Sequence, residues 1–421
     1  MSDTAYPSVN DLTLEEKASL TSGGDAWHLQ GVETKGIPGY MITDGPHGLR
    51  KSLASSTGET DLNDSVPATC FPPAAGLSSS WNPELIHKVG EAMAEECIQE
   101  KVAVILGPGV NIKRNPLGGR CFEYWSEDPY LAGHEAVGIV AGVQSKGVGT
   151  SLKHFAANNQ ETDRLRVSAN ISQRALREIY FPAFEHIVKT AQPWTIMCSY
   201  NRINGVHSAQ NRWLLTDVLR DEWGYEGIVM SDWGADHDRV ASLNAGLNLE
   251  MPPSYTDDQI VYAARDGRIQ PEQLDRMAQG MVDLVNKTRA AMSVENYRFD
   301  VDAHDEVAHQ AAVESMVLLK KRRRHPAGRG KRENRRHRRI RAHPALPGRR
   351  LVPHHPNQDD QLPRHPRRTR SGRRVRTGLH PRPRTGRSHA RSRSRRNRQK
   401  RRRRPHVPRP SGSRRIRRLR P

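Results

Sequence analysis

The last 101 residues of this 421-residue chain contain no aromatic side chain and almost no acidic one. All 23 Trp, Tyr and Phe residues lie within residues 1–320. Residues 321–421 carry 40 Lys and Arg against three acids, which are Glu333, Asp359 and Asp360. A segment this poor in apolar side chains cannot bury enough surface to offset the entropy lost on folding. We therefore predict a disordered, Arg- and Pro-rich tail over 321–421.

Other absences exclude whole classes of protein. No run of 18 apolar residues occurs, so we expect no membrane-spanning helix. The N-terminus has no basic stretch followed by an apolar one, which argues against a signal peptide and favours a cytoplasmic protein. The four cysteines have no CxxC spacing, so we expect separate buried or half-buried thiols. No metal-ligand spacing and no nucleotide-binding glycine motif is present, so we predict no metal and no cofactor.

The formal charge of +21 averages two different parts of the chain. Residues 321–421 have a net charge of +37, whereas residues 1–320 have a net charge of −16. The tail would bind the phosphates of nucleic acid by releasing counterions, and we expect this binding to be nonspecific. Interleaved aromatic residues, a zinc pattern and a helix-turn-helix pattern are all missing from it. The sequence leaves the oligomeric state open.

Continuous apolar runs alternate with amphipathic segments through the first 290 residues. The runs predict strands at 39–45, 102–110, 149–156, 195–201 and 227–234. Helices are predicted between them, at 82–101, 128–147, 172–191, 211–225 and 238–247, with a last one at 270–288. Uninterrupted apolar runs are typical of parallel strands buried on both faces. The pattern favours an α/β fold of the (β/α)8 TIM-barrel type, with a doubly wound open sheet as the alternative.

Polar side chains follow five of these strands where the strands end. Because the carboxyl ends of parallel strands meet at one edge, we expect these side chains to lie together. Carboxylates and cations around an aromatic ring suit a polyhydroxylated ligand, and glycoside cleavage requires one carboxylate as nucleophile. The best nucleophile candidate is Asp232, and its neighbours at the strand ends and in the following loops are Asp44, Arg120, Lys153, His154, Arg164, Tyr200 and Trp233.

Each of these residues also has a purely structural interpretation. Asp44 precedes Gly45-Pro46 and is compatible with a turn carboxylate. Lys153 and His154 fit a buried ion-pair partner and a core histidine, and Arg164 fits a partner for Glu161 or Asp163. His237-Asp238 fits a helix start, and Glu250 fits a structural role. Only the agreement among strands favours a site.

Several longer segments resemble one enzyme family. They are "TDGPHGLR", "NIKRNPLGGRCFEYWSEDPYLAG", "SLKHFAANNQETDR", "IMCSYNRINGVHSAQNRWLLTDVLRDEWGYEGIVMSDWGA" and "NLEMP". In this order and spacing they resemble the N-terminal barrel of glycoside hydrolase family three, in its β-glucosidase branch. The single-domain hexosaminidase branch fits less well, because the loop "AANNQETDRLR" has no histidine.

The resemblance implies a retaining hydrolase of terminal non-reducing β-D-glucosyl residues, with a β-glucoside or oligosaccharide as substrate and no metal or cofactor. By the same resemblance, Asp232 in "SDW" is the catalytic nucleophile and forms a covalent glycosyl intermediate. The residues implied to bind the sugar are Asp44, Arg120, Lys153, His154, Arg164 and Tyr200, with Trp233 beside it.

The resemblance ends after Lys320, within "SMVLLKKRRRH". In two-domain members of the family this apolar run begins an α/β sandwich that supplies the acid/base glutamate. We therefore assign 1–290 to the barrel and 291–320 to a linker and the first strand of a truncated second domain. The tail, 321–421, has the composition that a frameshift in a GC-rich gene would produce. Activity should be impaired without the glutamate, and a catalytically dead sugar-binding barrel is the alternative.

Overall fold

The computed structural model describes residues 6–54 and 60–320 of the chain. The tail that we predicted over 321–421, with its three acids, lies outside these residues. Within the described part, no helix is long and apolar enough to cross a membrane. The four cysteines are separate free thiols, as predicted, although Cys70 is exposed rather than buried or half-buried.

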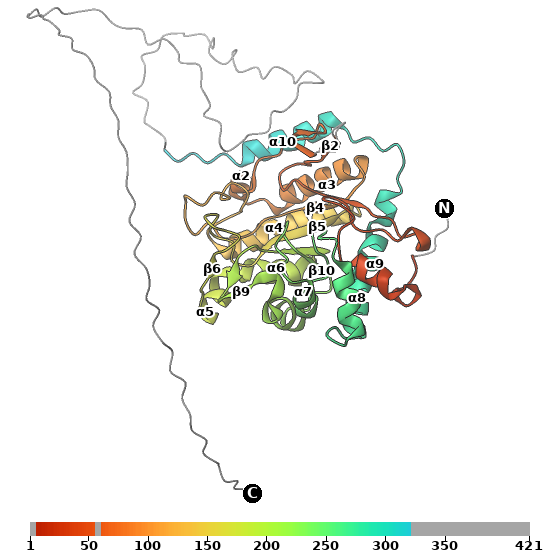
Figure 1. Ribbon diagram of the computed structural model, residues 1–421. Helices are drawn as coiled ribbons and strands as arrows, with labels where there is room; N and C mark the ends of the chain where they lie inside the picture. The colour runs from red at the N-terminus through yellow and green to blue at the C-terminus, as the bar shows by residue number, and fades with distance from the viewer. Residues whose placement is uncertain (1–5, 55–59, 321–421) are drawn as a thin grey trace, which may run out of the picture. The chain divides into compact units, whose positions relative to one another are not determined.

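A five-stranded parallel sheet forms the centre of the described region (Figure 1). Its spatial order is β1, β4, β5, β7, β10. The bounds are β1 (Met41–Asp44), β4 (Val102–Leu106), β5 (Gly149–Phe155), β7 (Thr195–Cys198) and β10 (Ile228–Met230). Every residue of the last four strands is buried, which explains their uninterrupted apolar character. The predicted α/β class with a parallel sheet is confirmed.

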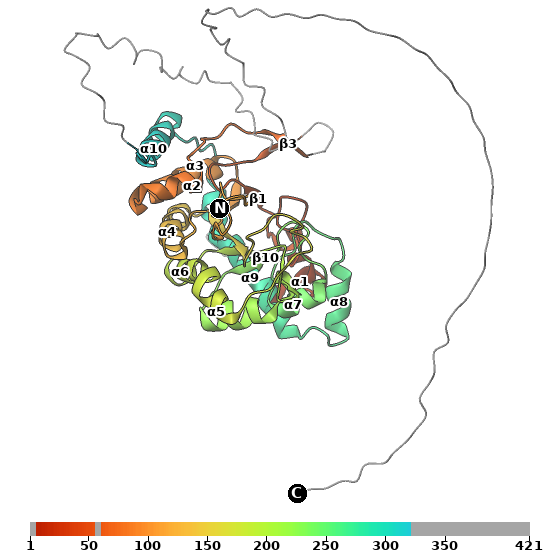
Figure 2. The same ribbon diagram turned by 90° about the vertical axis from the view of Figure 1, so that its left-hand side faces the viewer.

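Helices connect the strands and cover the sheet, and Figure 2 shows α3, α4 and α6 in succession along one side. The α-helices are α1 (Leu14–Leu20), α2 (Ala74–Leu77), α3 (Pro83–Gln99), α4 (Pro129–Ser145), α5 (Gln173–Ala175), α6 (Pro182–Ala191), α7 (Arg239–Ala245), α8 (Asp257–Arg265), α9 (Pro271–Met292) and α10 (Val301–Glu314). Helices α3 and α4 can approach closely because Gly142 has no Cβ. A Cβ at this position would collide with the His87 carbonyl oxygen.

Local sequence signals fix where several helices begin and end. Thr13 and Glu16 form a capping box at the start of α1. Asn82 and Asp128 cap α3 and α4, each followed by a proline at the first helical position. Helix α7 ends at Gly246, whose φ of 113° is a left-handed conformation that glycine adopts readily. These signals explain why most predicted helix boundaries agree with the structure.

Two predicted helices depart from regular α-helical geometry. The predicted helix at 172–191 consists of α5, a π-helical turn η4 (Leu176–Tyr180) and then α6. The predicted helix at 211–225 is π-helical over η6 (Trp213–Glu222). In the first case Pro182 removes a backbone donor where the helix resumes. Hydrophobic periodicity does not distinguish these helix types, so the sequence predicts a helix but not its hydrogen-bond pattern.

Small elements complete the described region. The β2–β3 hairpin (Ser52–Ala54 and Thr60–Ser65) is antiparallel. Strands β6 (Ser168–Ala169), β8 (Arg202–Ile203) and β9 (Val206–His207) form a separate three-stranded sheet. The short 3-10 turns are η1 (Val9–Asp11), η2 (Glu33–Lys35), η3 (Ser78–Ser80) and η5 (Ser208–Gln210).

Within the described residues, the central sheet contains five parallel strands rather than the eight of a regular (β/α)8 barrel. Beyond the outer strands, the chain makes isolated bridges. Met230 of β10 pairs with Leu249, and Met41 of β1 pairs with His28. The stretch "NLEMP", which follows a predicted helix, therefore lies beside β10 without forming a strand of its own.

Aromatic side chains fill the space between β5 and the helices behind it. The Phe155 ring at the end of β5 lies 5.2 Å from the Phe184 ring and 5.7 Å from the Trp223 ring. Phe181 joins the same cluster at 6.0 Å from Phe155. Such tilted and edge-on contacts add to the stability gained from apolar burial. They hold the end of β5, where polar residues begin, in a fixed position.

Residues 291–320 differ from our prediction of a linker and a strand. Helix α10 covers residues 301–314, and residues 316–320 have no regular structure. Leu318 and Leu319 are 76% and 92% exposed. A strand requires a neighbouring strand to satisfy its backbone groups, and no described strand pairs with this segment. The apolar run is therefore present but is not a strand.

Helix α10 is attached to α3 by a histidine held between two carboxylates. His304 is only 4% exposed; its Nδ1 lies 3.0 Å from Glu96 Oε1, and its Nε2 lies 3.3 Å from Glu95 Oε2. Its ring stacks on Phe299 at 4.7 Å. Burial alone would lower the pKa of His304, but the bonds to Glu96 and Glu95 raise it above its ordinary value. His304 thus links the two helices, and the raised pKa favours its protonated form there.

We predict that this bridge makes stability depend on pH. The raised pKa means that the stabilisation is complete below the unfolded-state pKa of about 6.5 and is lost as pH rises through the folded-state value. The substitution His304→Gln should cost on the order of 1 kcal/mol below that pH and progressively less above it. Thermal melting of the full chain across this pH range measures the effect.

The matched control is His309→Gln on the same helix, since the His309 side chain is 67% exposed. This change should shift the melting temperature little at any pH. A deficit in the His304 variant that stays constant or grows with pH would contradict the proposed bridge.

Candidate active site

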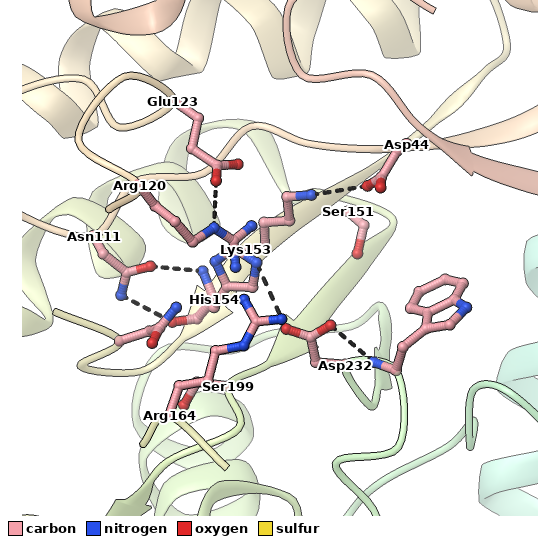
Figure 3. A network of polar contacts seen from close by, with 12 residues as sticks. Asp44, Asn111, Arg120, Glu123, Ser151, Lys153, His154, Arg164, Ser199 and Asp232 are labelled. Atoms are coloured by element: carbon pink, nitrogen blue, oxygen red, sulfur yellow. Dashed lines mark hydrogen bonds and ion pairs between the residues drawn. The ribbon is translucent and has the colours of Figure 1, made fainter. Parts of the chain in front are cut away.

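The predicted site residues come together at the carboxyl edge of the central sheet. Asp44 ends β1, Lys153 and His154 are the two residues before the last residue of β5, and Asp232 follows β10 by two residues. Figure 3 shows Lys153, His154 and Asp232 converging, with Arg120 and Arg164 beside them. The parallel strands thus produce the juxtaposition that the sequence predicted.

Asp44 of β1 and Lys153 of β5 form an ion pair, although β4 lies between these two strands. Lys153 Nζ donates to Asp44 Oδ1 at 3.2 Å (Figure 3). The Lys153 side chain is 4% exposed, whereas that of Asp44 is 36% exposed. Burial would raise the pKa of Asp44, but the Lys153 ammonium, with Arg50 and Arg120, lowers it below the ordinary value. Asp44 is therefore an ionised carboxylate whose side chain is partly exposed and can accept further hydrogen bonds.

Asp232 is a buried carboxylate with one oxygen engaged and one oxygen open. It is 7% exposed, and its Oδ1 accepts the Trp233 backbone N–H at 2.8 Å. Its Oδ2 has no hydrogen-bond partner among the described residues and lies 3.7 Å from His154 Nε2. Burial raises the pKa of Asp232, and the opposing influence of Arg120 and Lys153 only partly offsets that increase.

His154 is fixed at both its backbone and its ring. Asn111 Oδ1 accepts the His154 N–H at 2.9 Å, and Asn111 Nδ2 donates to the His154 carbonyl at 3.0 Å. The ring Nδ1 lies 3.2 Å from the Tyr124 hydroxyl. Burial, followed by the nearby cations Arg120, Lys153 and Arg164, lowers the pKa of His154 well below its ordinary value. The imidazole is neutral, so its contact with Asp232 is polar rather than an ion pair.

Two arginines border the site, each held by a glutamate. Arg120 Nε forms an ion pair with Glu123, which is 5% exposed. Arg164 Nη1 donates to Glu161 Oε2 at 3.0 Å, and its guanidinium lies 4.8 Å from the centre of the Tyr200 ring. The Glu161 pairing is one of the structural interpretations left open above. It is compatible with a binding role, because a guanidinium has donors left over.

Tyr200 and Trp233 supply the aromatic surfaces. Tyr200 is 7% exposed, and its burial and the negative charge of Asp232 raise its pKa, so the hydroxyl stays protonated. The Trp233 indole donates to the Ala26 carbonyl at 3.0 Å and lies 5.1 Å from the Trp27 ring. Trp27 lies far from Trp233 in the sequence, and no local pattern predicted their contact.

Two other polar groups singled out in the sequence are structural. Glu250 Oε2 accepts hydrogen bonds from the Ser22 hydroxyl at 3.1 Å and from buried Arg239 at 3.0 Å. Asp238 caps α7, as the helix-start interpretation predicted. Neither residue contacts the cluster around Asp232. The described residues also contain no group of three or more His, Cys, Asp or Glu side chains placed to hold a metal ion.

Three polar residues that hold the cluster around His154 were not predicted from the sequence. These are Asn111, Tyr124 and Asn158, all 3% exposed or less. Asn158 Nδ2 donates to the Tyr124 hydroxyl at 3.1 Å, and Tyr124 contacts His154. They lie in loops after β4 and β5, where no periodicity shows which way a side chain points. Their one sequence signal is their position inside the segments that resemble the family.

The chain is similar to known glycoside hydrolases. The glycosyl hydrolase family 3 N terminal domain matches residues 50–284. An "Exo-alpha-(1->6)-L-arabinopyranosidase" of Bifidobacterium breve is 92% identical over 320 residues, which are 76% of this chain and 42% of that protein. "Thermostable beta-glucosidase B" of Acetivibrio thermocellus is 53% identical over 314 residues, covering 74% and 41%. The crystal structure of a Bifidobacterium adolescentis GH3 beta-glucosidase aligns with a TM-score of 0.71 and 93% identity, covering 75% and 45%.

The parallel sheet and the acidic, cation-lined site at its carboxyl edge fit the class of glycoside hydrolases. The chain belongs to glycosyl hydrolase family 3, because the family's N-terminal domain accounts for more than half of its residues. The predicted resemblance is confirmed. The chain spans less than half the length of the curated relatives it matches.

The structural role of Glu250 gives a testable prediction. Replacing Glu250 by Gln leaves the buried Arg239 charge with only Asp257, at 3.0 Å, as an acidic partner. Removing one partner of a buried pair costs up to about 3 kcal/mol, and Asp257 reduces that cost. We expect Glu250→Gln to lower the melting temperature without weakening glucose binding by the protein that remains folded.

Glu15→Gln is the control, since the Glu15–Arg265 pair is 59% and 58% exposed. That exposed pair should contribute less than about 1 kcal/mol. A folded Glu250 variant that fails to bind glucose would place Glu250 in the site and contradict its structural role.

Proposed function

We propose that this chain carries the nucleophile half of a retaining glycosidase that acts on terminal non-reducing β-D-glucosyl residues. The observation that carries the proposal is Asp232, a buried carboxylate with one oxygen held by Trp233 N–H and the other without a partner in the described region. Burial raises the pKa of Asp232, and the nearby Arg120 and Lys153 cations oppose that increase by stabilising the carboxylate. A nucleophile needs this combination of fixed orientation and an open lone pair.

The surrounding side chains would hold the sugar by its hydroxyl groups. Asp44 would accept hydrogen bonds, and Lys153, His154, Arg120 and Arg164 would donate them. Residue by residue, these are the positions that resemble the family's sugar-binding motif. Tyr200 and Trp233 would contribute the apolar surfaces beside the C–H face of the ring.

The proposed reaction proceeds in two displacements. A lone pair on Asp232 Oδ2 attacks the anomeric carbon, and the bond from that carbon to the leaving oxygen breaks. The leaving oxygen keeps the bonding electrons and requires a proton, unless it is already a stable anion. Water then attacks the same carbon and loses a proton to a base, which releases the sugar and the Asp232 carboxylate.

No acidic residue of the described site is well suited to donate the proton. Asp44, Glu123 and Glu161 form ion pairs with Lys153, Arg120 and Arg164. The Lys153 ammonium lowers the pKa of Asp44, so that carboxyl is ionised and cannot donate a proton. In the β-glucosidase branch the donor is implied to be a glutamate of the second domain. We infer that the 421-residue chain lacks efficient acid catalysis, which is worth roughly 10²–10⁴-fold in rate.

We also infer that the sequence changes reading frame near codon 321. The similarity to the B. breve relative extends over 320 residues, and the composition changes to Arg, Pro and Gly at residue 321. Translating the other two frames of the DNA downstream of codon 320 tests this inference. An apolar α/β sequence in one of them would support it, and none in either would contradict it.

We further infer that the central sheet closes into a barrel. Four isolated bridges support closure: Met230–Leu249, Ser22–Glu250, Gly23–Leu29 and His28–Met41. Together they lead from β10 back to β1. Two of the four are antiparallel, so the ring that we propose is an irregular relative of the (β/α)8 barrel.

A second substrate class is an α-L-arabinopyranoside, which the name of the 92% identical B. breve relative supports. The 53% identical A. thermocellus relative and the 93% identical B. adolescentis structure are both named β-glucosidases, so identity within this domain supports the β-glucoside as strongly as the arabinopyranoside. The two sugars differ in the orientation of the C4 hydroxyl and in the hydroxymethyl group on C5. Rates on the dinitrophenyl β-D-glucoside and the dinitrophenyl α-L-arabinopyranoside, compared on one preparation, decide between them.

We predict a strong dependence on the leaving group. The 421-residue chain should release dinitrophenol from 2,4-dinitrophenyl β-D-glucoside, because this leaving group needs no proton. Cellobiose, which does need one, should be cleaved roughly 10²–10⁴-fold less well than by an enzyme with its acid in place. Asp232→Asn should reduce dinitrophenol release roughly 10³-fold or more.

Asp236→Asn is the matched control, since Asp236 lies in the same loop and bonds to the Ser242 hydroxyl at 2.6 Å, outside the cluster. It should retain the release rate. Full turnover of cellobiose would overturn the missing-acid inference, and an active Asp232→Asn chain would overturn the nucleophile assignment.

A further inference from the structure

The two ring nitrogens of His154 face different partners, and only one of them carries the proton of the neutral ring. Nδ1 lies 3.2 Å from the Tyr124 hydroxyl, and Nε2 lies 3.7 Å from Asp232 Oδ2. The residue is 1% exposed, so these two contacts dominate the surroundings of the ring nitrogens. The position of this proton decides whether a donor or a lone pair faces the proposed nucleophile.

The orientation of the Asn158 amide determines whether the Tyr124 hydroxyl accepts a hydrogen bond from it. Asn158 Nδ2 lies 3.3 Å from Glu161 Oε1, and that carboxylate, which is paired with Arg164, can only accept. A flipped amide would place two acceptors against each other. The nitrogen therefore faces Glu161, and its second hydrogen points to the Tyr124 hydroxyl at 3.1 Å. In this orientation Asn158 Oδ1 has no partner in the described region.

Tyr124 is then left with one hydrogen to donate. Its hydroxyl oxygen accepts from Asn158, and the acceptor within reach of its hydrogen is His154 Nδ1. Burial raises the pKa of Tyr124, so the phenol keeps its proton. The neutral His154 ring accepts at Nδ1 and must carry its own proton on Nε2.

We propose that Tyr124 and Asn158 are positioning residues that hold His154 with its proton on Nε2, directed toward Asp232 and the sugar. The part concerning the sugar rests on the proposed function. A hydroxyl seated beside Nε2 would accept its hydrogen and donate its own to Asp232. With the opposite tautomer, the Nε2 lone pair would repel both the carboxylate and the hydroxyl oxygen.

The backbone around Tyr124 is shaped for this contact. Gly109 bridges to Tyr124, and a Cβ at residue 109 would lie 3.0 Å from Tyr124 Cε1 and 3.1 Å from Cδ1. Glycine therefore lets the ring lie against the strand end beside His154. The Tyr124 and His154 rings meet edge-on at 6.1 Å. Asn111 fixes the His154 backbone from the other side, so the hydroxyl and Nδ1 have little freedom to separate.

The direct test is the tautomer of His154 in the full chain, read from ring ¹⁵N shifts after histidine-selective labelling. Protonated and unprotonated ring nitrogens differ widely in shift, and the loss of signals in His154→Gln assigns the residue. We expect the proton on Nε2 and a hydrogen-bonded, unprotonated Nδ1. A charged ring at neutral pH, or a proton on Nδ1, would overturn the proposal.

Two variants test the roles of the supporting residues. Tyr124→Phe removes the donor to Nδ1, so the Nδ1 resonance should move toward that of a free nitrogen. An unchanged resonance would overturn the role of Tyr124. Asn158→Asp offers Tyr124 a carboxylate, so Tyr124 should donate there and the His154 proton should move to Nδ1. A proton that stays on Nε2 in this variant would overturn the role of Asn158.

Tyr225→Phe is the matched control, because Tyr225 has the same 3% exposure and donates to the Ile228 carbonyl at 2.8 Å. It loses a buried hydrogen bond away from the site and should leave the His154 signals unchanged. A change in those signals would show that any buried Tyr→Phe substitution disturbs the ring, which would overturn the specific role of Tyr124.

Calorimetric titration with D-glucose tests the connection to the sugar. Tyr124→Phe should bind glucose about 5-fold more weakly, in proportion to one lost hydrogen bond, and Tyr225→Phe should bind it as the unsubstituted chain does. Equal affinity in the Tyr124 variant would overturn the positioning role toward the sugar. If the unsubstituted chain binds no glucose, the proposed function fails, while the ¹⁵N shifts still decide the tautomer.

Discussion

The site depends on one constraint, which is that a carboxylate and several cations share a buried edge of a parallel sheet. Burial raises the pKa of Asp232, which is 7% exposed, and the nearby Arg120 and Lys153 cations offset part of that increase. Lys153, whose side chain is 4% exposed, is paired with Asp44. The parallel order β1, β4, β5, β7, β10 makes these residues neighbours although they are far apart in the sequence. The sheet topology therefore brings together the opposite charges that this buried site contains.

The strand-end residues were predictable from the sequence because two simple patterns coincide at them. A continuous apolar run identifies a buried strand, and the first charged residue after it must lie at the carboxyl edge, which is where Asp44, Lys153, His154 and Asp232 are found. Asn111 and Tyr124 were not predictable in this way. They lie in loops whose backbone path is set by tertiary contacts such as that between Gly109 and the Tyr124 ring. Periodicity likewise could not separate the π-helix η6 from an α-helix.

Stabilising and reactive carboxylates differ in this structure by the number of donors they face. Glu250 accepts from Ser22, Arg239 and Ser254 and has no role open to it beyond holding the chain. Asp232 Oδ2 lacks any such donor among the residues described. An unsatisfied buried oxygen is costly, and a bound ligand is one way to satisfy it. Asp236 Oδ2 and Glu135 Oε2 also lack a partner among the described residues, so Asp232 is distinguished by His154, Arg120 and Lys153 beside it.

The most direct test of this account is to trap the nucleophile. A 2-deoxy-2-fluoro-β-D-glucoside with a dinitrophenyl leaving group should react with the full chain without needing a proton donor, and the fluorine should slow hydrolysis of the adduct. Peptide mapping by mass spectrometry then locates the attached sugar. We predict a single adduct on Asp232. An adduct on Asp44 or Glu161, or no adduct with this reagent or its arabinopyranosyl counterpart, would contradict the assignment of Asp232 as the nucleophile.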